Sequence, residues 1–78
     1  MDDNENELRR LVGRRLRLAR RLVELTQQEV ATAAGVSRSM VALVEQGANG
    51  IDVYRLRRMA GAVGMDLTEL FDEPHGRR

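Results

Sequence analysis

The sequence contains no cysteine, no tryptophan and no lysine, and only one proline and one histidine among its 78 residues. Without cysteine there is neither a disulfide framework nor thiolate chemistry. The histidine, His75, lies near the C-terminus, so no histidine-centred base or metal cluster can form. The two aromatic residues, Tyr54 and Phe71, leave the core to aliphatic and methionine side chains.

Two further absences narrow the class of protein. No apolar run approaches the roughly 18 residues that cross a membrane, and no signal peptide is recognisable, so we expect a cytoplasmic location. The glycines are scattered and form no phosphate-binding loop, and Ser37 and Ser39 have no neighbouring base. We therefore expect no enzymatic activity, no cofactor and no metal ion. A chain of this length also leaves no room for a small-molecule ligand domain.

The net charge of +1 conceals a separation of charge along the chain. Residues 1–7 carry four acidic side chains and no basic one, and we interpret them as an acidic tail leading into a helix. Residues 8–71 form the expected single domain, with eleven arginines against six acidic residues. Residues 72–78 are balanced and are expected to be a disordered tail. A basic body favours a polyanionic partner through counterion release, although an arginine-rich helix face can also be simply solvated.

Residues 26–47 carry the pattern of two short helices joined by a tight turn. Thr26 followed by Glu29 is a capping box, and Gly35 is suited to end the helix over about 27–34. Ser37 would then cap a helix over about 38–46, which Gly47 closes. Helices so closely joined must cross at a steep angle. The residues expected at their packed faces are Val30, Ala31, Ala33, Ala34, Val41 and Val44, with Ala31 at the crossing.

The rest of the chain also predicts helices, and no strand. A long first helix is expected from about residue 5 to 23, with a capping box at Asn4 and Glu7. Gly13 within it costs about 1 kcal/mol, and Leu18 lies off its core stripe. Asp52 caps a helix over 53–63, and a short fifth helix begins at a capping box of Asp66 and Glu69 and ends by Pro74. The predicted inward residues of the first and fourth helices are Val12, Leu16, Ala19, Val23, Leu56, Met59, Ala60 and Val63. The apolar residues of the fifth helix are Leu67, Leu70 and Phe71.

From about Val12 to Phe71 the chain resembles the lambda/434 repressor and Cro-type (XRE-like) helix-turn-helix DNA-binding domains. The segments that carry the resemblance are Leu25-Thr26-Gln27 and Glu45-Gln46-Gly47. It implies a compact all-α domain of five helices whose third helix enters the major groove of double-stranded DNA. It also implies a homodimeric transcriptional regulator, in most cases a repressor, that pairs through the region Val63–Phe71. The chain departs from the family at Glu24, where glycine is common, and at Ile51, where proline is common.

The resemblance assigns phosphate contacts to the start of the second helix. Gln27 would donate its amide to a phosphate oxygen, because helix N-termini face the DNA backbone, and Gln28 is a second candidate. Asn49, in the loop after the third helix, could also approach a phosphate, although asparagine and glycine equally make simple turns.

The exposed face of the third helix supplies the candidate base contacts. Arg38 can pair with O6 and N7 of guanine or merely neutralise a phosphate. Ser39 could bind a base or a phosphate, and Ser37 is mainly a cap. Leu43 could touch a thymine methyl group or a neighbouring subunit, and Met40 could do the same or fold into the core. Ala42 completes this DNA-facing set. With so few polar groups, direct contacts should discriminate modestly between sequences.

The resemblance also implies a structural ion pair. Glu45 lies near the C-terminus of the third helix, where its charge opposes the helix dipole. In the family this position pairs with an arginine of the first helix, and Arg20 is the matching residue. We expect a partly buried bidentate pair.

Two alternatives to a sequence-specific regulator stay open. One is a protein-binding adaptor of the same fold with Met40 and Leu43 as its apolar patch. The other is an architectural protein that binds DNA non-specifically through the arginine-rich first helix.

Overall fold

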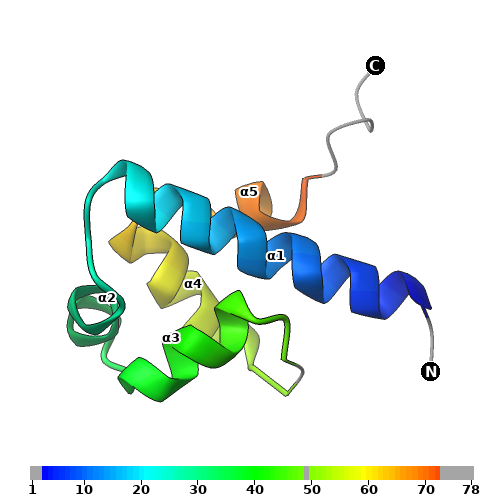
Figure 1. The fold of residues 1–78 in the computed structure, drawn as a ribbon, viewed down its shortest axis with the longest axis horizontal. Coiled ribbons are helices and arrows are strands. Elements are labelled where there is room, and N and C mark those ends of the chain that lie inside the picture. Colours follow the sequence, from blue (N-terminus) through cyan, green and yellow to red (C-terminus); the bar gives the residue numbers. More distant parts are fainter. Residues whose placement is uncertain (1–2, 49, 73–78) are drawn as a thin grey trace.

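A computed structural model describes residues 3–48 and 50–72, and this part of the chain contains helices and turns but no strand (Figure 1). The C-terminal tail from residue 73, with Pro74 and His75, and the loop residue Asn49 lie outside the described residues. No helix in the described ranges is both long enough and apolar enough to cross a membrane. The helices are α1 (Asp3–Leu22), α2 (Gln27–Ala34), α3 (Arg38–Glu45), α4 (Val53–Ala62) and α5 (Leu67–Phe71). The expected all-α fold of five helices is confirmed.

The long helix α1 runs across the molecule, with α3 along one side and α5 on the other (Figure 1). Helix α2 contacts both α3 and α4, and α4 also contacts α5. The first turns of α1 extend beyond the other helices, so the acidic residues from Asp3 onward lie in a helix that projects from the body.

Side-chain caps fix the starts of α2 and α3 as the sequence predicts. The Glu29 backbone N–H donates to Thr26 Oγ1 at 3.0 Å, and the Thr26 N–H donates to Glu29 Oε1 at 2.8 Å. The Met40 N–H donates to Ser37 Oγ at 3.0 Å. Gly35 ends α2 in the left-handed conformation at φ 70°. The steep turn between the two helices is thus specified locally.

The starts of α4 and α5 also follow the sequence signals, whereas the start of α1 does not. Asp52 caps α4 by accepting the Arg55 N–H at 2.8 Å, and the Asp66 N–H donates to Glu69 Oε1 at 2.8 Å. Helix α1 already includes Asp3, so Asn4 lies in its first turn. The predicted capping box at Asn4 and Glu7 is therefore wrong, because Asn4 is not the residue that precedes the helix.

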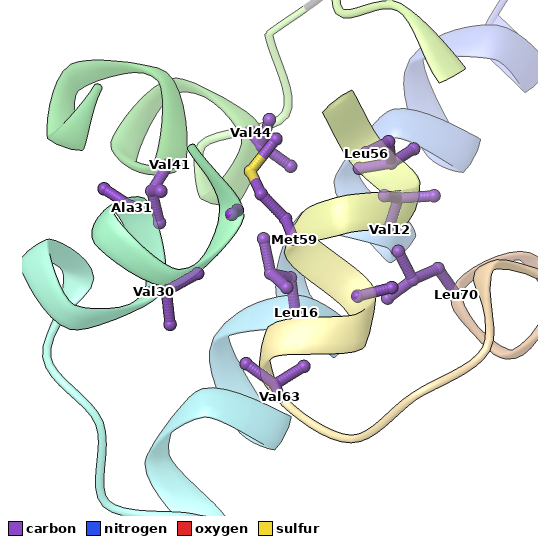
Figure 2. Close-up of a cluster of buried hydrophobic side chains, with 12 residues drawn as sticks. Val12, Leu16, Val30, Ala31, Val41, Val44, Leu56, Met59, Val63 and Leu70 are labelled. Atoms are coloured by element: carbon purple, nitrogen blue, oxygen red, sulfur yellow. The ribbon is translucent and has the colours of Figure 1, made fainter. Parts of the chain in front are cut away.

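The core is aliphatic and centred on Met59 of α4, which lies between the side chains of α1 and α3 (Figure 2). The largest fully buried side chains come one from each of the five helices, namely Leu16, Val30, Val41, Met59 and Leu70. Most of the predicted inward residues are confirmed, and two expectations need correction.

Ala33 and Val23 are more exposed than the sequence suggests. Ala31 and Ala34, with Val30, form the packed face of α2, and Ala33 faces solvent because it lies on the other side of that helix. Val23 is 48% exposed, because α1 ends one residue earlier and the chain turns there. Phe71 is 37% exposed at the end of α5, where only Leu70 is buried.

Gly13 sets the distance between α1 and α3. A Cβ atom at this position would lie 2.4 Å from the carbonyl oxygen of Val44 and 2.8 Å from that of Glu45. Only glycine allows the two backbones to approach so closely. The sequence shows Gly13 only as a helix residue of low propensity, and its packing role comes from the fold.

Glu24 adopts a left-handed backbone conformation, with φ 60°. It follows the end of α1 at the position where the family commonly has glycine. A side chain here costs about 1 kcal/mol relative to an unstrained backbone, because Cβ approaches the following carbonyl oxygen. The turn from α1 into α2 therefore retains local strain.

Candidate nucleic-acid interface

One face of α3 is open to solvent while the opposite face is fixed in the core. Val41 and Val44 are buried, whereas Ser39, Leu43 and Gln46 are exposed on the other side of the helix. Arg38, at the first position of α3, is also exposed, and Ala42 is half-buried at the edge of this face. The helix thus presents a narrow surface with one cation and one hydroxyl near its start.

Met40 and Leu43, the two apolar candidates on α3, lie in different surroundings. Met40 is half-buried and packs against the hydrophobic core. Leu43 is 46% exposed, which leaves an aliphatic group in the middle of the open face. Of the two residues, Leu43 is the one available for an apolar contact.

Arg20 and Glu45 form a bidentate ion pair that joins α1 to the end of α3. Arg20 Nε donates to Glu45 Oε2 at 2.7 Å, and Arg20 Nη2 donates to Glu45 Oε1 at 3.0 Å. Arg20 Nη1 donates to the carbonyl oxygen of Leu25 at 2.9 Å. The Glu45 side chain is only 4% exposed and that of Arg20 13% exposed. A buried carboxylate is tolerated because charged and hydrogen-bonding partners surround it.

The hydrogen bond with Glu45 raises the pKa of the Arg20 guanidinium above its ordinary value. Burial opposes this shift, and the charge of Glu45 adds to it. Because the pKa is raised, the stability that Arg20 contributes is fully present below its ordinary pKa and is lost only at still more alkaline pH. The pair is therefore charged on the arginine side at every physiological pH.

Gln27 connects this ion pair to the start of α3. Its Nε2 donates to Glu45 Oε1 at 3.1 Å, and its Oε1 accepts a hydrogen bond from Arg38 Nη1 at 3.1 Å. The Glu45 carboxylate accepts only, so it fixes which end of the Gln27 amide faces inward, and the carbonyl oxygen is left for Arg38. One hydrogen-bonded chain therefore runs from Arg20 through Glu45 and Gln27 to Arg38.

Sequence reasoning did not find this chain of contacts. The sequence places Gln27 and Arg38 at the first positions of α2 and α3, but their meeting depends on the crossing of the helices. Of the neighbouring candidates, Gln28 is exposed and donates to Thr32 Oγ1 at 3.2 Å within α2. Ser37 accepts the Met40 N–H as a cap, and its exposed hydroxyl lies at the start of α3.

Several arginines brace the fold from the outside. Arg15 Nη1 donates to the Glu69 carbonyl oxygen at 2.8 Å, which ties α1 to α5. Arg58 Nε donates to the Ala34 carbonyl oxygen at 2.8 Å, at the end of α2. Arg55 pairs with Asp52 at 3.1 Å within the start of α4. In the described part of the chain, no cluster of three or more His, Cys, Asp or Glu side chains could hold a metal ion.

The crossed pair α2 and α3, with a braced inner face and an open outer face, defines a helix-turn-helix DNA-binding domain. A family model described as a helix-turn-helix domain matches residues 11–71. The chain belongs to this family, which comprises helix-turn-helix domains of the lambda-repressor type. No curated protein matches the chain with significant similarity.

Proposed function

We propose that the protein is a small homodimeric transcriptional regulator that binds double-stranded DNA sequence-specifically, with α3 in the major groove. The observation that carries this proposal is the contact between Gln27 and Arg38, which holds an exposed arginine at the start of α3. An arginine whose position is fixed before binding loses less side-chain entropy when it pairs with a base. Repression requires only that the bound dimer occupy DNA that the transcription machinery needs, and we propose that role.

Arg38 is the proposed base-reading residue. One guanidinium nitrogen donates to Gln27, and the other N–H groups are free to form a bidentate pair with O6 and N7 of guanine. Ser39 can add a hydrogen bond to a base or a phosphate, and Ala42 and Leu43 can contact a thymine methyl group. Met40 contributes to this surface only through its exposed edge, because most of the side chain packs on the core.

Phosphate contacts are proposed at the two helix starts that flank the reading face. Gln27 uses one amide hydrogen on Glu45, and the second remains for a phosphate oxygen. Gln28 and Ser37 are also exposed. These contacts would set the orientation of α3 without specifying a base. Asn49 retains its proposed phosphate role from the sequence alone.

The dimer is proposed to form through the region Val63–Phe71. Within it Val63 and Leu70 are buried in the core, so they support the surface without forming it. Met65 and Leu67 are half-buried, and Phe71 is 37% exposed. A two-fold dimer would place two recognition helices about 34 Å apart, one turn of DNA.

The test is an in vitro selection of random DNA duplexes with the purified protein, followed by sequencing of the retained molecules. We expect an inverted repeat with half-sites one helical turn apart. Arg38→Ala should weaken binding to the selected site about 10- to 100-fold and relax the preference at one guanine in each half-site. Arg57→Ala, which removes an exposed arginine on α4, should leave the preference unchanged. Retention without a motif would refute sequence-specific binding, and no retention would redirect the search to a protein partner.

A further inference from the structure

We propose that Arg10, Arg14 and Arg17 of α1, here called the arginine row, form a second binding surface for the phosphate backbone of DNA. This inference rests on the proposed function, because it extends the DNA contact beyond α3 to the first helix. None of the three residues belongs to the reading face or to the chain of contacts around Glu45.

The three side chains lie on one face of α1. Spacings of four and three residues place neighbours above one another on a helix, and this face points away from the core residues Val12 and Leu16. All three arginines are exposed, and together with Glu45 and Gln46 they line an open hollow of about 310 Å³. The row therefore borders a concave surface at the junction of α1 and α3.

The positive charge of this hollow is not balanced by the protein. Among the described residues, the ion pairs are Arg9 with Glu5, Arg20 with Glu45 and Arg55 with Asp52, so none includes a member of the arginine row. The one acidic side chain in the lining, Glu45, is already occupied by Arg20 and Gln27. Three exposed cations around a hollow would bind an anionic group by charge-assisted hydrogen bonds.

The hollow continues the open face of α3. Gln46, which lines it, follows Ser39 by seven residues, or about two helical turns, and so lies on the same face as Ser39 and Leu43. The close packing at Gly13 holds α1 against this end of α3, and Arg10 packs beside Gly47. If α3 lies in the major groove, the row is beside the DNA backbone at the C-terminal end of that helix.

The spacing of the row fits a nucleic-acid strand. With a rise of about 1.5 Å per residue, Arg10 to Arg17 covers about 10 Å of the helix axis. One DNA strand carries a phosphate about every 3.4 Å along its axis, so three cations over this length match its charge density. Arg57 on α4, another exposed arginine, is not among the residues that line this hollow.

The experiment measures the binding of the full chain to a fluorescent duplex between 50 and 200 mM salt, with the selected site and with a random sequence. The test variant is Arg14→Gln with Arg17→Gln, since glutamine keeps helix propensity and removes the charge. The controls are two single variants, Arg57→Gln on α4 and Arg21→Gln on α1. Each removes one exposed arginine that does not line the hollow. Circular dichroism checks that every variant remains folded.

If the row binds phosphates, the double variant should lose about 1.8 units per subunit, or about 3.6 units for the proposed dimer, of the slope of log affinity against log salt. The affinity of the dimer relative to wild type would then change roughly 100-fold between the two salt concentrations. Both duplexes should be affected alike, and the Arg57→Gln control should keep the wild-type slope. An unchanged slope in the double variant would refute phosphate binding by the arginine row while leaving the proposed sequence-specific binding intact. A reduced slope in a protein that prefers no sequence would support the row and refute the proposed reading by α3. A wild-type protein that binds neither duplex would overturn both.

Discussion

The two ends of helix α3 are held in place by different means. Its N-terminal end is joined to α2 by a short turn, a left-handed Gly35 and the Ser37 cap, all within a few residues of one another. Its C-terminal end is held by α1, through the Arg20–Glu45 pair and the close approach at Gly13. Contacts within a few residues thus set how α3 turns away from α2, and long-range contacts fix α3 against α1.

The largest effect on stability is expected from removing the ion pair between α1 and α3 at Glu45. Glu45→Ala leaves Arg20 buried without its carboxylate and removes the partner that orients Gln27. We expect the free energy of unfolding to fall by about 3–5 kcal/mol. Urea denaturation followed by circular dichroism measures this loss.

The control for that substitution is Glu7→Ala, which also removes a carboxylate from an α-helix, but one that is exposed. It should change the free energy of unfolding by less than about 0.5 kcal/mol. If Glu45→Ala were as stable as this control, the ion pair would not be what holds α3 against α1.

A smaller loss is expected from Gly13→Ala. The added methyl group would meet backbone carbonyl oxygens, which cannot rotate away, so α1 must move outward from α3. Overpacking of this kind costs about 1–3 kcal/mol. Gly61→Ala on α4 is the matched control, because a Cβ there meets no atom within 4 Å. That variant should be more stable than wild type by up to about 1 kcal/mol, and thermal unfolding of both variants would separate packing from helix propensity. Equal shifts of the same sign would contradict the role assigned to Gly13.

The smallest effect is expected on the local side, at Ser37. Ser37→Ala removes the oxygen that accepts the Met40 N–H and should cost about 1 kcal/mol. Ser39→Ala, two residues on and exposed, removes a hydroxyl that caps nothing and should be nearly neutral for stability. Chemical denaturation of the pair measures the cap, and indistinguishable curves would show that the turn does not depend on it.

The contacts at the N-terminal end of α3 could be predicted well, because each of them involves residues that are close together in the sequence. Thr26 with Glu29, Gly35 and Ser37 are recognisable without knowing what the helices pack against. The burial of Val41 and Val44 followed from their spacing alone. Boundaries were less certain, so Val23 was assigned to the core although α1 ends before it.

The long-range side could be predicted only where the family resemblance supplied it. The resemblance pointed to Arg20 and Glu45, which form the expected contact. Nothing in the sequence indicated that Gln27 would join Glu45 to Arg38, or that Gly13 would lie under the carbonyl groups of α3. Both depend on where two helices cross, and the helical spacing of residues within one helix does not contain that information.

The projecting start of α1 has a consequence for how the protein approaches a partner. Glu5 and Glu7 lie in its first turns, and seven arginines follow them along the same rod between Arg9 and Arg21. Opposite charges at successive levels of one long helix separate charge along α1 despite a net charge of only +1 for the whole chain. In the field of a polyanion such a body experiences a torque as well as an attraction, and it turns its acidic end outward before contact. The helix that anchors the fold thereby orients the protein during diffusion, and added salt shortens the range over which it can do so.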